Sequence, residues 1–258
     1  MPSDLWVKDA KDRIVLALAV GGILILFSAV AFAIYAPMAD SLNAIAATFP
    51  REILQIIGGI GPGGYVVSQL FNVLGPIALV AFAVTLGTSL LAGEEEDGTL
   101  GLLMSYPLSR FGVLAAKAAA LITMVALATA LFWLGVTLSA SYQQVGLAQG
   151  NIAATCVHLF ALSAAFGLVG LAAGASTGRP GTAGAWAGTI TALSYLSATM
   201  LPVAGLSQWA QLSPWHYYNA SEPLTNGLDA GHVVLLAAVG GIAFAVAGVC
   251  FARRDLRG

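Results

Sequence analysis

The chain has 258 residues, of which 59% are hydrophobic and only 9% are charged, and its formal net charge is −2. A soluble domain is about half apolar and a quarter charged, so the composition predicts an integral membrane protein. The slightly acidic balance argues against nucleic-acid binding, which needs a basic surface. Cys156 and Cys250 lie in apolar stretches and indicate no disulfide framework.

Six stretches reach the roughly 20 apolar residues that a helix needs to cross a bilayer. We expect one all-α membrane domain over residues 1–258, with spans at about 14–36, 66–92, 112–140, 152–175, 181–205 and 233–252. Pro76 lies in the second span and is predicted to kink it. Residues 1–13 are predicted to form a short amphipathic element at the membrane interface, with Leu5 and Trp6 as anchors.

The first span has an alternative interpretation as a signal peptide, because Ala31-Phe32-Ala33 resembles a cleavage site. Its apolar stretch is longer than a usual signal core. The leader is also not net basic, because three aspartates offset its three cations. Both features favour a true span.

The cations predict the orientation. An even number of spans places nine of the ten on one face, and only Arg51 falls on the other. The positive-inside rule makes the nine-cation face cytoplasmic, with both termini inside. The nine are Lys8, Lys11, Arg13, Arg110, Lys117, Arg179, Arg253, Arg254 and Arg257.

The outer connections and the glycines carry weaker signals. The connection at 37–65 holds an interrupted apolar stretch at 42–60, which suits a short helix or a re-entrant element. The connection at 206–232 holds four aromatic residues typical of an interfacial belt: Trp209, Trp215, Tyr217 and Tyr218. Glycines four residues apart, at 170, 174 and 178 and at 184 and 188, allow close helix contact between two subunits or within one.

Several kinds of chemistry lack their motifs. No G-x-x-x-x-G-K-[ST] loop is present, so this chain is not expected to bind and hydrolyse ATP. The three histidines are far apart and no metal motif occurs, so we expect no metal site, no cofactor and no catalytic residue. Lys117 lies near the inner end of its span, where its side chain can snorkel. Coupled carriers usually need a buried ionisable group, so we expect any work to be driven from outside the membrane.

The most informative segment is the acidic run at 94–97, between the second and third spans. Glycine, threonine and four apolar residues follow it, Pro107 ends it, and Ser109 is placed to cap the next helix. The pattern predicts a short helix across the inner face, with the acids at its start, where the helix dipole favours them. The alternative is a solvated turn. The apolar residues favour an exposed helix that docks into a partner's groove.

This segment resembles the signature of ABC type-2 permeases, the membrane subunits of ABC exporters. The resemblance rests on the run at 94–103, on Tyr106-Pro107-Leu108-Ser109-Arg110, and on Lys117 downstream. Leu108 stands where valine is common. The outer segment at 212–218, the later Asn226-Gly227-Leu228 and the ending at 251–256 are also similar to the family.

The resemblance implies an ABC type-2 exporter-like bundle of six transmembrane helices in the plasma membrane, with a short cytoplasmic coupling helix after helix two. It also implies a dimer of permeases and two separate ATPase subunits that bind ATP and Mg. Arg110 and Lys117 would pair with the acids. The implied ATPase-coupling residues are Glu94, Glu95, Glu96, Asp97, Gly98, Thr99, Leu100, Leu102, Leu103, Arg110 and Lys117.

In similar exporters spans two and five line the substrate path, so their polar residues are path candidates. They are Gln69, Asn72, Thr85, Thr88, Thr189, Thr191, Ser194, Tyr195 and Ser197. The alternative for each serine or threonine is a bond to its own helix, and His158 has the alternative of a packing residue. The predicted function is the permease subunit of an ABC exporter with a separate ATPase. The alternatives are an ATP-independent channel or scaffold, and an integral membrane enzyme, for which no polar catalytic cluster is found.

Overall fold

The computed structural model describes residues 2–35, 37, 41, 44–45, 48–50, 64–106 and 108–254. Within these ranges the extended regular elements are helices and no strand occurs. The expected element at 42–60 lies almost wholly outside the described residues, as do Arg51, Pro107 and the tail from 255 onward.

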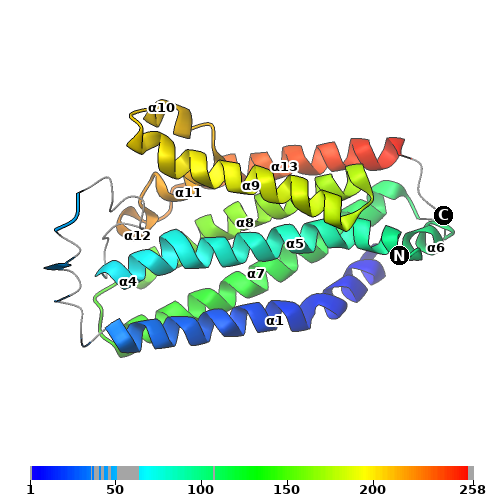
Figure 1. The fold of residues 1–258 in the computed structure, drawn as a ribbon. Coiled ribbons are helices and arrows are strands. Elements are labelled where there is room, and N and C mark those ends of the chain that lie inside the picture. Colours follow the sequence, from blue (N-terminus) through cyan, green and yellow to red (C-terminus); the bar gives the residue numbers. More distant parts are fainter. Residues whose placement is uncertain are drawn as a thin grey trace.

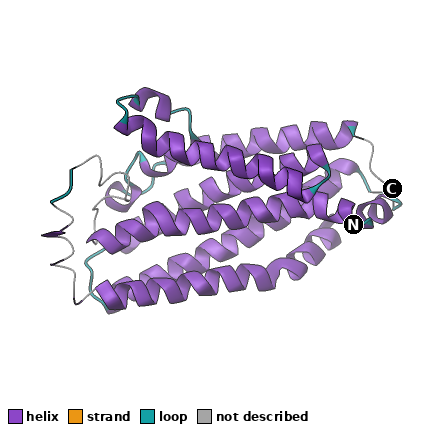
Figure 2. Ribbon diagram, in the orientation of Figure 1, coloured by secondary structure: helices purple, strands orange, loops and turns teal. Residues whose placement is uncertain are grey.

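Long helices lie side by side, and the chain reverses direction between them (Figures 1 and 2). We call one end of the bundle the α6 end and the opposite end the α11 end. The starts of α1, α7 and α9 lie at the α6 end, together with the last residues of α5, α8 and α13. The elements are α1 (Pro2–Tyr35), α4 (Gly64–Gln69), the π-helix η2 (Leu70–Leu74), α5 (Gly75–Glu96), α6 (Thr99–Met104), α7 (Arg110–Tyr142), α8 (Gln149–Thr177), α9 (Pro180–Val203), α10 (Ser207–Ala210), α11 (Pro214–Asn219), α12 (Pro223–Asn226) and α13 (Ala230–Arg253).

Five helical stretches of the described chain are long and apolar enough to cross a membrane: Leu5–Ile34, Val67–Glu96, Arg110–Tyr142, Gln149–Thr177 and Ala230–Arg253. They coincide with five of the six predicted spans. The predicted fifth span is also a helix, α9, with 24 residues. It is not among the five, because glycine, serine and threonine lower its apolarity.

The first helix differs from its prediction. Residues 2–13 are not a helix of their own, because α1 runs unbroken from Pro2 to Tyr35. No proline or capping residue divides it. Leu5 is buried rather than anchored at a surface, and the Trp6 indole N–H donates to Thr123 Oγ1 of α7 at 3.3 Å. The first turns of α1 therefore already pack on α7.

The sequence predicted a kink at Pro76, and the structure has a π turn, η2, directly before this residue. Gly75 N–H donates to Leu70 O, five residues back, and Pro76 then stands in the first turn of α5. A π turn is one of the known ways in which a helix accommodates such a residue. The chain from α4 through η2 to α5 thereby stays one helical stretch.

Close contact between α5 and α8 depends on glycines. Gly87 lies directly against the backbone of Gly167 and Leu171, and Gly170 lies against Val84 O. These small residues let two helix backbones approach within the same chain. The other glycines behave differently: Gly178 ends α8 at φ +62°, and a Cβ added at position 184 would meet no atom within 4 Å. The α5–α8 contact forms the centre of the bundle.

Candidate functional site

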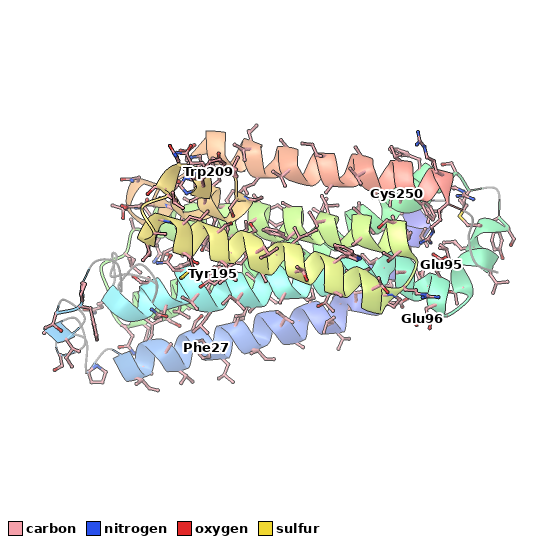
Figure 3. The ribbon with its side chains drawn as sticks, turned by 45° about the horizontal axis from the view of Figure 1, so that its top comes forward. Phe27, Glu95, Glu96, Tyr195, Trp209 and Cys250 are labelled. Atoms are coloured by element: carbon pink, nitrogen blue, oxygen red, sulfur yellow. The ribbon has the colours of Figure 1, made fainter. Side chains whose placement is uncertain are left out.

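The acidic run lies at the α6 end, where α5 ends (Figure 3). Glu94, Glu95 and Glu96 are the last residues of α5, Asp97 is its C-cap, and Gly98 reverses the chain at φ +72°. This corrects the prediction that the acids begin the short helix, because the first turn of α6 contains no acid. The acids continue the register of α5 until the left-handed glycine stops it.

That position is unfavourable by itself, because a helix C-terminus carries partial negative charge. Two cations from distant parts of the chain compensate. Lys117 Nζ lies 2.5 Å from Glu94 Oε1 and 2.9 Å from Asp9 Oδ1. Arg254 pairs with Glu95. The end of α5 is thus tied to α1, α7 and the residue that follows α13.

Lys117 does not snorkel, contrary to the prediction. Its side chain is 0% exposed, because α1 covers it and supplies Asp9 as a second carboxylate. The pairing with Glu94 agrees with what the family resemblance implied. The sequence analysis did not predict that Asp9 pairs with Lys117. The available signal was a carboxylate within the first helical turns of the chain. Oδ2 of Asp9 and Oε2 of Glu94 are buried without a hydrogen-bond partner, so two carboxylates share one ammonium.

Arg110 does not pair with the acids as expected. Its guanidinium donates to the backbone carbonyls of Phe251 and Arg254, each at 2.7 Å, and lies over the Phe251 ring. The last carbonyls of a helix have no intrahelical donor, so an arginine at the start of α7 can cap the end of α13. Ser109 caps α7 as predicted, accepting from Gly112 N–H at 3.0 Å.

α6 is anchored on one side and open on the other. Leu100 is fully buried, Leu103 is half-buried, and the Thr99 hydroxyl donates to Glu94 O at 3.1 Å. Leu102 is 70% exposed, in contrast to Leu100 and Leu103. Five exposed residues come from α6 and the segments directly before and after it, and we call them together the α6 surface: Glu96, Asp97, Leu102, Tyr106 and Phe111. It combines two acids with three large apolar side chains.

The candidate path residues lie on neighbouring helices, since α5 packs against α9. Thr85 of α5 and Thr189 of α9 are exposed, and Gln69 and Asn72 are half-buried. Three others bond within the chain: Thr88 to Thr85 O, Thr191 to Ala187 O, and Ser197 to Ser194 O. Ser194 contacts Ser213, and the Tyr195 ring meets Trp215.

A second polar group lies at the α11 end. Tyr217 stacks edge-on between His216 and His232, with ring centroids 5.3 Å from each. Burial, and secondarily His232, lowers the pKa of His216. Asp229 caps α13 by accepting from His232 N–H at 3.1 Å, and this bond lowers its pKa. Among the described residues, no three His, Cys, Asp or Glu side chains form a group that could hold a metal ion.

Five helices long and apolar enough to cross a membrane are typical of a multi-pass membrane protein. The family model of the ABC-2 family transporter protein matches residues 7–256. The chain therefore belongs to the ABC-2 transporter family, as its acidic segment predicted. Comparison with curated proteins finds no match.

Proposed function

We propose that the chain is the permease subunit of an ATP-binding cassette exporter in the plasma membrane. Two copies would form the substrate path, and two separate ATPase subunits would bind ATP and Mg and drive them. The observation that carries this proposal is the α6 surface: exposed acidic and apolar side chains from α6 and the segments that flank it, next to partly buried ion pairs at the end of α5.

The α6 surface suits a protein partner. Its apolar side chains fit a hydrophobic groove, and its acids favour basic residues at the groove's rim. Family membership supports an ATPase as that partner, since such permeases typically work with ATPase subunits. On this proposal the α6 end faces the cytoplasm, in agreement with the cations at the starts of α1 and α7.

The ion pairs provide a route for movement. Asp9, Lys117 and Arg254 connect the end of α5 to three other parts of the bundle. A displacement of α6 is then transmitted to α1, α5 and α7 together, and does not only bend the connection between α5 and α6. The proposed export direction and two-fold assembly follow from the resemblance to the family.

We further propose that α9 is the sixth span. At 1.5 Å per residue its 24 residues extend about 36 Å, enough to cross the hydrocarbon core. Its lower apolarity suits a helix that borders a polar path beside Thr85 of α5 rather than facing lipid all round.

The test is co-purification, in nanodiscs, with the ATPase encoded beside this chain, followed by measurement of ATP hydrolysis. Leu102→Asp and Glu96→Lys are expected to reduce the retained ATPase at least tenfold. Leu212→Asp is the matched control, because Leu212 is 77% exposed at the α11 end. A complex that survives both α6 variants overturns the docking role, and the absence of any complex favours an ATP-independent channel or scaffold.

A further inference from the structure

The π turn in the α4–η2–α5 stretch leaves one backbone carbonyl short of a donor. Gly75 N–H donates to Leu70 O, five residues back. In the same register Phe71 O would accept the N–H of residue 76, but that residue is proline and has none. Phe71 O therefore needs a donor from outside its own helix.

Tyr218 of α11 supplies that donor. Its hydroxyl lies 2.5 Å from Phe71 O, and its side chain is fully buried. A buried hydroxyl and a buried carbonyl are each destabilising when unpaired. The two groups satisfy each other, although they are 147 positions apart in the chain.

α11 is also held by the helices on its other sides. The Trp215 ring lies 5.9 Å from the Phe166 ring of α8 and 5.0 Å from the Tyr195 ring of α9, centroid to centroid. Ser213, the N-cap of α11, bonds to Ser194 of α9 at 2.7 Å. The short helix α11 therefore contacts η2, α8 and α9 together.

The same helical stretch carries Phe71 near one end and the coupling acids at the other. Val67–Glu96 is continuous. Phe71 and Glu94 are separated by about 35 Å along a helix that rises 1.5 Å per residue. A rigid displacement of this stretch therefore moves both the acidic end and the carbonyl that Tyr218 holds.

We propose that the Tyr218–Phe71 bond is a latch through which α5 moves α11 when the ATPase drives the α6 end. This inference rests on the proposed function and deepens it. Tyr218 is a positioning residue: it makes the α11 end follow the α6 end, and so links nucleotide binding to opening on the far side.

The test follows the α11 end with two spin labels, at Leu212→Cys and Tyr142→Cys. Both side chains are exposed, at 77% and 85%. Cys156 and Cys250 are replaced by alanine, and labelled chain is diluted with unlabelled chain in the ATPase complex. Electron–electron resonance distances are compared between the nucleotide-free and the vanadate-trapped complex.

We expect the distance distribution of the parent complex to shift on trapping. Tyr218→Phe, which removes only the hydroxyl, should lose this shift while retaining at least half of the ATP hydrolysis. Tyr217→Phe is the matched control and should shift like the parent, because Tyr217 makes ring contacts to two histidines.

Pro76→Ala separates a latch from a purely structural bond, because alanine restores an N–H for Phe71 O. The loss in Tm caused by Tyr218→Phe, about 3 °C in the parent, should shrink in the Pro76→Ala background. The shift on trapping should stay absent in the double variant.

Three results overturn the latch: a normal shift in Tyr218→Phe, a shift restored by Pro76→Ala, or no shift in a parent complex that hydrolyses ATP. A parent chain that binds no ATPase instead overturns the proposed function, on which the latch depends.

Discussion

Lys117 is the residue at which three helices meet. Its ammonium joins Asp9 of α1 to Glu94 of α5, and its full burial keeps bulk solvent from screening the loss of either charge. Removing one partner of a buried ion pair typically costs about 3–5 kcal/mol. The cluster has two carboxylates, Asp9 and Glu94, and one ammonium. Removal of a carboxylate and removal of the ammonium should therefore differ in their effect on stability.

We therefore expect Lys117→Met to lower the free energy of unfolding by about 3–5 kcal/mol, because the buried Asp9 and the partly buried Glu94 carboxylates lose their counter-charge. Asp9→Asn should cost far less, since one ammonium then faces one carboxylate. Thermal unfolding in detergent measures both, and Lys117→Arg serves as the charge-retaining control. Equal losses in the methionine and asparagine variants would contradict this ranking.

The histidine group at the α11 end predicts a pH dependence. Burial lowers the pKa of His216 in the folded chain, so below its ordinary value of about 6.5 the unfolded chain takes up more protons. The stability contributed by neutral His216 is thus complete above pH 6.5 and declines as the pH falls. Asp229 has a lowered pKa and loses its contribution only below about pH 4.

Tm should accordingly fall between pH 7.5 and pH 5.5, and His216→Gln should reduce that fall. The measurement is a thermal melt at both values, with Asp229→Asn as a control whose pH difference over this window stays unchanged. A full-sized fall in His216→Gln would remove His216 as its cause.

At the scale of elements, the contact between α5 and α8 determines how tightly the bundle closes. Gly87 touches backbone atoms of α8 rather than side chains, so no rotamer change can make room for a larger residue. The spacing of glycines at 170 and 174 predicted close packing, but the partner helix within the same chain became visible only when both helices were placed.

Gly87→Leu should force the two helices apart and destabilise the protein by more than the 1–3 kcal/mol or so typical of overpacking. Gly241→Leu is the matched control, because a Cβ added at Gly241 of α13 would meet no atom within 4 Å. Thermal unfolding and the yield of monodisperse protein report the difference. Similar melting temperatures for the two variants would contradict the packing argument.

At the scale of the whole molecule, the orientation and the span count remain predictions that cysteine labelling can check. In a background without Cys156 and Cys250, a membrane-impermeant maleimide should label Leu212→Cys and Leu206→Cys in intact cells. Ser105→Cys and Ser176→Cys should react only after permeabilisation. Labelling of Leu206 and Ser176 from the same side would show that α9 does not cross.

The sequence by itself determined the membrane class, the approximate positions of five candidate spans and the segment at 94–110, because apolar runs and turn residues are local features of the chain. It also led to the correct family. The tertiary structure decided which charges meet. Asp9 and Arg254 join the acids. Such contacts follow from helix packing, which no local pattern encodes. The buried position of Lys117 and the Tyr218–Phe71 bond were invisible in sequence for the same reason.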